Sequence, residues 1–241
     1  MRMMTFAGRT LKEILRDPLY MAFGIGFPLG ILLLLTAIQA NIPVTLFEIE
    51  KLTPGIAVFG LSFMTLFAAM LVSKDRSGAL IQRLYTTPLT AADYICGYML
   101  PLLPIGFAQT IVCYSAAAFL GLKITVHVVY AVLMSIPVSL FFIALGLLCG
   151  TVFNDKQASG ICGPLLTNLA AWLSGAWFDL NLVGGVFKKA ADVLPFSHSV
   201  ELQRMLLAGN AVSGHLWWVL GYAFMTVLIA VTVFTRRMKS C

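Results

Sequence analysis

Charged residues are scarce in this sequence, and their scarcity excludes an ordinary water-soluble fold. Only 11% of the 241 residues are Asp, Glu, Lys or Arg, whereas soluble domains average about 25%. Hydrophobic residues make up 60%, and the mean hydropathy is +0.93. Soluble helices keep a polar stripe, which the long apolar segments of this chain lack. The composition therefore favours an integral membrane protein over a buried soluble bundle.

Six long runs contain no Asp, Glu, Lys or Arg. Crossing a hydrocarbon layer about 30 Å thick takes roughly 20 helical residues at 1.5 Å rise, and each run can supply them. We therefore predict an all-α integral membrane protein, one domain over 1–241. Its six transmembrane helices are expected at 18–38, 54–72, 95–120, 128–152, 158–178 and 214–235. An interfacial amphipathic helix is expected at 1–17, with Met4, Ala7, Leu11, Ile14 and Leu15 at helical spacing.

Basic residues divide unevenly between the two sides of these predicted helices. Eleven of the 16 Lys and Arg residues fall on the side of the two chain ends, and five fall on the other side. The positive-inside rule then predicts a multi-pass protein of the cytoplasmic membrane with both termini cytoplasmic. The net charge of +6 is explained by this topology and by contact with the lipid bilayer, so it gives no case for nucleic-acid binding.

Several motifs of catalysis and ion coupling are missing. The five cysteines form no C-x-x-C and have no histidine at ligand spacing, so no metal site is expected. No G-x-x-x-x-G-K-[ST] phosphate loop occurs, so we expect neither ATP hydrolysis nor a cofactor bound by this chain. The predicted spans offer no Asp, Glu or Lys for ion coupling and no visible catalytic constellation. An ion-coupled secondary transporter and an intramembrane enzyme remain as alternatives.

A polar stretch between the second and third predicted spans is too long for a plain connection between helices. Leu80 and Leu84 fall on one helical face, Pro88 prevents continuation, and Thr90 begins a capping-box pattern. This pattern predicts a short amphipathic helix at 75–86. It is either an interfacial anchor or a docking element for a cytoplasmic partner.

The segment KDRSGALIQRLYTTPLTAADYICGYML resembles the cytoplasmic segment of ABC-2 type transporter permeases. The resemblance is carried by Asp75, Arg76, Gly78, Leu80, Leu84 and Pro88, although Glu is usual at the first position and Thr is usual at Ala79. The later stretches LSGAWFDL and LPFSHSVELQRMLLAG are similar to the family's segment after the fifth span. Together these matches cover nearly the whole chain.

This resemblance implies that two permease copies, identical or paralogous, pair with two copies of a separate ATPase, which binds ATP and Mg²⁺. The helix at 75–86 would be the coupling helix, contacting the ATPase through Asp75, Arg76, Gly78, Leu80, Arg83, Leu84 and Pro88. The substrate path would be lined by Ser62, Phe63, Thr65, Thr167, Asn168 and Trp172. External helices within 180–209 would gate it through Leu194, Pro195, Phe196, Glu201 and Arg204, a simple exposed loop being the alternative.

The expected function is that of a permease subunit of an ATP-driven exporter. Uncharged spans suit a hydrophobic or amphipathic cargo, such as a drug, an antimicrobial peptide or a lipid-like compound. A polysaccharide exporter permease is an alternative. Asn168 either lines the path or only bonds to a neighbouring helix. The spacing of Gly146 and Gly150 predicts a close helix contact in the fourth span.

Overall fold

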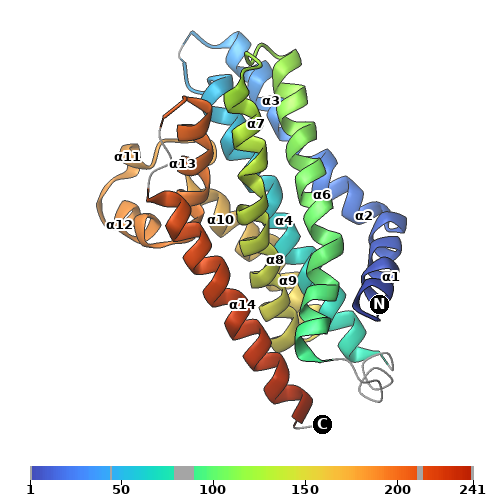
Figure 1. Ribbon diagram of the computed structural model, residues 1–241. Helices are drawn as coiled ribbons and strands as arrows, with labels where there is room; N and C mark the ends of the chain where they lie inside the picture. The colour runs from blue at the N-terminus through green and yellow to red at the C-terminus, as the bar shows by residue number, and fades with distance from the viewer. Residues whose placement is uncertain (1, 44, 79–89, 211–213, 240–241) are drawn as a thin grey trace.

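The structure, a computed structural model, describes residues 2–43, 45–78, 90–210 and 214–239 (Figure 1). All regular elements within these ranges are helices, which confirms the all-α class for the described part of the chain. Five stretches are long and apolar enough to cross a membrane. They are Pro18–Asn41, Ile49–Ser77, Ala92–Phe119, Val126–Val152 and His215–Arg236.

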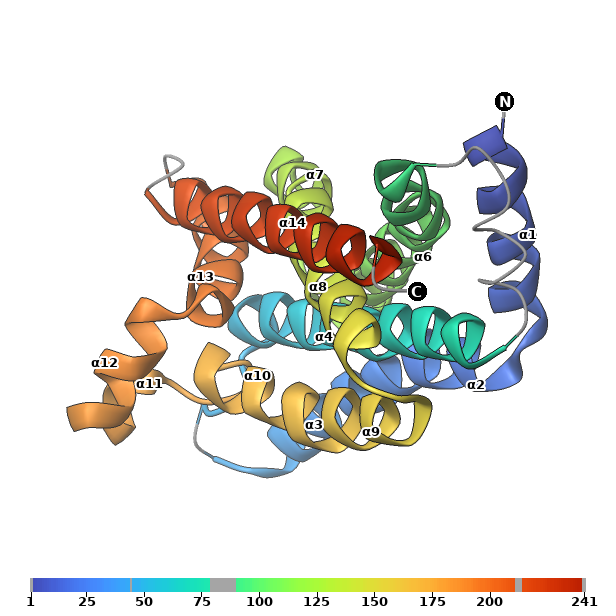
Figure 2. The same ribbon diagram turned by 90° about the horizontal axis from the view of Figure 1, so that it is seen from below.

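The chain begins with α1 (Arg2–Arg16), which lies crosswise beside the lower part of the bundle (Figures 1 and 2). Asp17 separates it from the first candidate span, because its side chain accepts a hydrogen bond from the Leu19 amide at 2.9 Å. That span consists of α2 (Pro18–Met21), a π-helical turn η1 (Ala22–Gly26) and α3 (Phe27–Asn41).

The second span, α4 (Ile49–Ser77), is the centre of the bundle. In its most apolar window 89% of the residues are buried, against 17% in the first span. It packs on α6 (Ala91–Phe119) and most extensively on α8 (Ser135–Val152), and Figure 2 shows it surrounded by other helices. Because neighbours cover α4 on nearly every side, its sequence is apolar around its whole circumference.

The contact between α4 and α8 depends on two glycines of α8. A Cβ atom at Gly146 would overlap the Thr65 carbonyl oxygen, and one at Gly150 would lie 2.5 Å from the Ala69 carbonyl oxygen. The predicted close contact at this G-x-x-x-G is therefore confirmed, since only glycine lets the two backbones approach so closely.

The fifth apolar run differs most from its expected form. Residues 155–174 form α9 (Asp155–Gly160), a π-helical turn η2 (Ile161–Leu165) and α10 (Leu166–Ser174), and they are not among the five candidate spans. The polar residues of α9 lower the hydropathy, and Gly175, at φ +64°, ends the helix in the left-handed conformation. The six-span count therefore stays a prediction.

The remaining elements complete the bundle and cover its upper end. α7 (Val126–Leu133) precedes α8, and α14 (His215–Lys239) ends the described chain. Between α10 and α14 lie three short helices, α11 (Leu180–Val183), α12 (Gly185–Val193) and α13 (Pro195–Leu207). α13 packs against α14, α7, α4 and α10 (Figure 1).

Candidate functional site

The predicted coupling helix lies only partly within the described residues. Four of its expected contact residues fall in 79–89, outside the described ranges: Leu80, Arg83, Leu84 and Pro88. Asp75 and Arg76 belong to the last turn of α4, and Gly78 is its exposed C-cap. The structure therefore shows what holds the helix that leads into the predicted coupling segment.

The carboxylate of Asp75 binds inside the bundle. Its side chain is 7% exposed and accepts hydrogen bonds from the Arg9 guanidinium at 3.2 and 3.3 Å. The Tyr98 hydroxyl donates a further hydrogen bond at 2.8 Å. A buried carboxylate needs such partners, because an unpaired one would lose its hydration without compensation. Asp75 thus joins α4 to α1 and α6.

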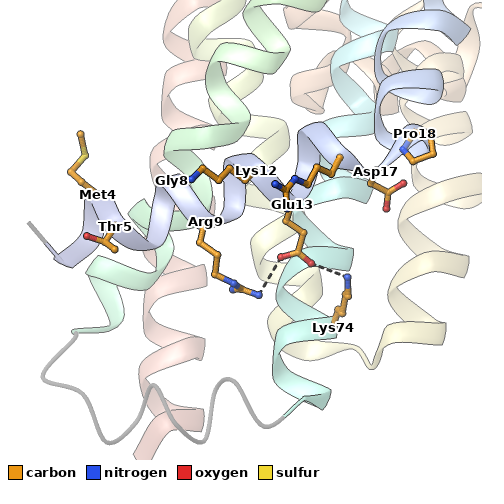
Figure 3. A pocket seen from close by; sticks show the side chains of 10 residues that line it. Met4, Thr5, Gly8, Arg9, Lys12, Glu13, Asp17, Pro18 and Lys74 are labelled. Atoms are coloured by element: carbon orange, nitrogen blue, oxygen red, sulfur yellow. Dashed lines mark hydrogen bonds and ion pairs between the residues drawn. The ribbon is translucent and has the colours of Figure 1, made fainter.

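A second ion-pair chain runs along the surface beside Asp75 (Figure 3). Arg9 also contacts Glu13 at 3.2 Å, and Glu13 accepts a hydrogen bond from Lys74 at 2.8 Å. Positive and negative side chains therefore alternate from Arg9 through Glu13 in α1 to Lys74 in α4. We refer to Arg9, Glu13, Lys74, Asp75 and Tyr98 as the α1 clamp.

Aromatic packing supports the α1 clamp from the apolar side. The ring of Phe6 in α1 meets Tyr98 edge-on at 4.9 Å and Tyr94 at 5.8 Å, both in α6. A side chain at Gly97 would overlap the Phe6 ring, so the glycine allows this approach. α1 therefore packs as part of the bundle.

The apolar face of α1 differs from the predicted stripe. Phe6, Ala7 and Ile14 are buried, whereas Met4 and Leu15, both assigned to the apolar stripe from spacing, are exposed. The face buried against the bundle is thus rotated toward Phe6 to meet α6, and Met4 and Leu15 stay available to the membrane interface, so the interfacial role of α1 remains a prediction.

Arg76 binds the end of α8. Its guanidinium donates to the carbonyl oxygens of Gly150 at 2.7 Å and Phe153 at 3.2 Å, and also to that of Thr151. The last carbonyls of a helix lack intrahelical partners and carry partial negative charge, so a cation is favourable there. Asp75 and Arg76 together fix the end of α4 to α1, α6 and α8.

The predicted path residues of α4 are buried within the protomer. The Ser62 hydroxyl donates to the Phe59 carbonyl at 2.6 Å, and the Thr65 hydroxyl donates to the Phe142 carbonyl at 2.9 Å. Phe63 packs edge-on against Phe59 at 5.4 Å. In this conformation Ser62 and Thr65 bond to backbone carbonyls and Phe63 packs against a neighbouring ring, so none of the three faces an open path.

The predicted path residues of α10 divide between two faces. Thr167 is buried and bonds to the Gly163 carbonyl, whereas Asn168 and Trp172 are exposed, Trp172 to 54%. The Asn168 amide donates to the Pro164 carbonyl one turn earlier at 2.6 Å and, in the part of the chain that the structure describes, makes no hydrogen bond to a neighbouring helix. Asn168 and Trp172 point away from the bundle.

The predicted gate residues gather at the start and along one side of α13. Pro195 begins the helix after Leu194, and Phe196 packs against Phe141 and Phe142, with ring centroids 5.9 and 6.0 Å away. Further along, Arg204 pairs with Glu201 at 2.9 Å and donates to the carbonyls of Lys51 at 3.2 Å and Gly175 at 2.8 Å. α13 is thereby attached to the beginning of α4 and the end of α10.

A histidine pair joins α13 to α14 at the same end. Nδ1 of His198 lies 2.6 Å from Nδ1 of His215, and Nε2 of His198 lies 2.9 Å from the Asp192 carbonyl oxygen. Because that carbonyl only accepts, His198 donates from Nε2 and accepts at Nδ1 when neutral. Burial lowers the pKa of His198 below its usual value, as does the neighbouring His215, while Asp192 and Glu201 oppose the shift.

Sequence reasoning missed the α1 clamp and the histidine pair for related reasons. Arg9 and Asp75 are 66 positions apart, and His198 and His215 are 17 apart, so no local spacing connects them. The local signal at Asp75 was an acidic residue two positions after an apolar run, which is equally compatible with a partner-facing surface.

Comparison with known proteins finds one matching family model and several related proteins. The family model described as "ABC-2 type transporter" matches residues 2–208. Nodulation protein J from Sinorhizobium fredii is 25% identical over 94% of this chain and 86% of the relative. The proteins of the same name from Rhizobium meliloti and Rhizobium leguminosarum bv. trifolii are 22% and 25% identical, over 93% and 82% of this chain and 85% and 74% of the relatives.

Proposed function

This chain belongs to the ABC-2 type transporter family, and we propose that it is the permease subunit of an ATP-driven exporter in the cytoplasmic membrane. The family match and the apolar helices support a multi-pass transport protein. In the proposed complex, six spans per copy place both chain ends in the cytoplasm. Two permease copies pair with two ATPase subunits, which bind ATP and Mg²⁺.

The attachment of the end of α4 is the observation that carries this proposal. Asp75 and Arg76 bind three other helices within the last turn before 79–89, the segment we propose to dock on the ATPase. A force applied to that segment would move the ends of α1, α4, α6 and α8 together. This is the requirement for converting a motor stroke into a change between two states of the bundle.

The exposed faces of the protomer support a hydrophobic or amphipathic cargo. Phe23 and Phe27 of the first span, with Leu169 and Trp172 of α10, are exposed apolar or aromatic residues. We propose that Asn168 and Trp172 face the transport path between two copies. Ser62, Phe63, Thr65 and Thr167, which are buried here, would contribute only after the bundle changes conformation.

A glycan cargo is the second candidate. The observation that favours it is a groove of about 1090 Å³ beside α13, where Phe47 and Trp177 lie among Glu201 and Arg204. Aromatic faces next to charged and polar groups suit a neutral molecule that is rich in hydroxyl groups.

The coupling assignment is tested by reconstitution with the cognate ATPase. Leu84→Ala should remove about 1.5 to 3 kcal/mol of burial from the proposed contact, and Arg83→Glu should add repulsion if the ATPase groove is acidic. We expect the double variant to weaken ATPase association and lower cargo-stimulated hydrolysis. Lys123→Glu, at the opposite end of the bundle, is the matched control. If the double variant retains both association and stimulated hydrolysis, the coupling assignment is wrong.

The path assignment is tested by an export profile over hydrophobic, peptide and glycan cargoes. Asn168→Leu and Trp172→Ala change exposed side chains, so both variants should insert and fold normally. We expect the range of exported compounds to change while basal ATP hydrolysis does not. Phe224→Ala, on an exposed face of α14, is the control. An unchanged profile for both α10 variants would place the path elsewhere.

A further inference from the structure

An open groove of about 960 Å³ runs along α1 (Figure 3). Two adjacent rows of α1 line it, together with Lys74 from α4. Gly8 lies at its middle, and a Cβ atom added there would meet nothing within 4 Å. The missing side chain therefore leaves this part of the groove open.

The charges of the groove do not cancel. Of its acidic residues, Glu13 is neutralised by Arg9 and Lys74, and Asp17 caps the amide of Leu19. Lys12 and Arg16 are exposed and pair with no side-chain carboxylate among the described residues. The segments outside the described ranges contain no Asp or Glu that could serve instead. Since Asp17 carries a single charge, the groove keeps a net positive charge, with two cations that lack an ion-pair partner among the described residues, one helical turn or about 6 Å apart along the axis.

These cations lie shortly before the first candidate span, where the headgroup phosphates are expected if that span crosses the bilayer. Arg16 lies two residues before Pro18, where the first candidate span begins. Leu15 and Leu19 are exposed beside Arg16, so an apolar strip continues from the cationic groove toward the span. A ligand with a negative head and an apolar tail fits both features, because each part meets its complement.

We propose that the groove formed by α1 and Lys74 binds the headgroup phosphate of an anionic phospholipid in the adjacent leaflet, through Lys12 and Arg16. The acyl chains follow Leu15 and Leu19 along the first span. This site is distinct from the cargo path and the ATPase contact, and it does not rest on either assignment.

The proposal is tested by measuring which lipids the full-length protein retains. The protein is reconstituted in vesicles of phosphatidylcholine and phosphatidylglycerol, extracted gently, and its bound lipids are identified by native mass spectrometry. A contribution of about 1 kcal/mol per cation predicts that Lys12→Gln with Arg16→Gln lowers the preference for phosphatidylglycerol about thirty-fold. Lys156→Gln with Arg236→Gln is the matched control, because it removes two exposed charges that form no ion pair within the described ranges, from the same end of the molecule.

Two further measurements separate a site from a diffuse surface charge. Gly8→Leu fills the groove without changing its charge, and we expect a several-fold loss of retained phosphatidylglycerol. An equal loss in the Lys156/Arg236 control, or full retention in Gly8→Leu, would overturn the proposal. Displacement of phosphatidylglycerol by inorganic phosphate at matched ionic strength would also overturn it, because the site would then select a free anion over a lipid.

Discussion

Breaking the ion pair between Arg9 and Asp75 should lower the free energy of unfolding by an amount that depends on which partner is replaced. Asp75 is buried, with a side chain that is 7% exposed, whereas Arg9 is 42% exposed and can return to water. Arg9→Ala leaves a carboxylate buried with the Tyr98 hydroxyl as its remaining side-chain partner among the described residues. Asp75→Asn keeps an oxygen for that hydroxyl and releases Arg9 to Glu13 and solvent.

The magnitudes follow from this difference. Removing one partner of a buried ion pair costs about 3 to 5 kcal/mol, because the remaining charge is uncompensated. Asp75→Asn should cost only about 1 to 2 kcal/mol, since a hydrogen bond to a charged group contributes about 1.5 to 3 kcal/mol and the exposed Arg9 loses less. Glu13→Gln, which removes a more exposed pair, should cost about 0 to 1 kcal/mol. The double variant of Arg9 and Asp75 should cost less than the sum of the two single variants.

The assay is a double-mutant cycle on the free energy of unfolding, measured by detergent titration of the reconstituted protein with tryptophan fluorescence. The α1 clamp predicts a coupling energy of about 1 to 3 kcal/mol between Arg9 and Asp75. Additive effects, with Arg9→Ala costing no more than Glu13→Gln, would show that the pair is a screened surface contact. In that case Asp75 would be free to meet an ATPase directly, and our account of the end of α4 would be refuted.

Three further results are expected. Since burial lowers the pKa of His198, the folded protein holds fewer protons than the unfolded chain just below the usual value of about 6.5. Unfolding free energy should therefore fall as the pH drops below 6.5, and this fall should shrink in His198→Gln but persist in His127→Gln. Gly146→Ala should cost more than 2 kcal/mol through overlap with α4, and Gly221→Ala, which meets nothing within 4 Å, should cost nothing measurable by the same titration. Arg76→Gln should cost about 1.5 to 3 kcal/mol, and hydrogen exchange should show the end of α8 opening more often, whereas unchanged exchange would contradict the capping role.

The features that the sequence predicted are those decided by local composition. Five of the six apolar runs form helices long enough to span, because length and hydropathy decide that property. The glycine pair at Gly146 and Gly150 was also predictable, since four-residue spacing puts both on one helix face. In the fifth run, by contrast, the uncharged residues at its start are too polar for a strong hydropathy signal, and Gly175 ends the helix early.

The predictions were weakest where long-range pairing decides a residue's environment. Asp75 follows an apolar run by two positions, and the sequence assigned it, with Arg76, to a segment that contacts the ATPase. Only the fold brings Arg9 and Tyr98 to it from α1 and α6. The exposure of Asn168 and Trp172 likewise depends on how α10 is rotated against α4, which the periodicity of a uniformly apolar helix does not specify.

The position of the arginines explains how uncharged spans can still be joined firmly at both ends. α4 has 29 residues, about 43 Å of helix, and its interior contacts are almost entirely apolar. Apolar contacts permit sliding, because they have little directional preference. Hydrogen bonds from Arg204 to the Lys51 carbonyl at one end, and from Arg76 to the end of α8 at the other, are directional. An axial movement of α4 would therefore also move α13 or break the contact with α8, and this couples α13 to the end of α4 that carries Asp75.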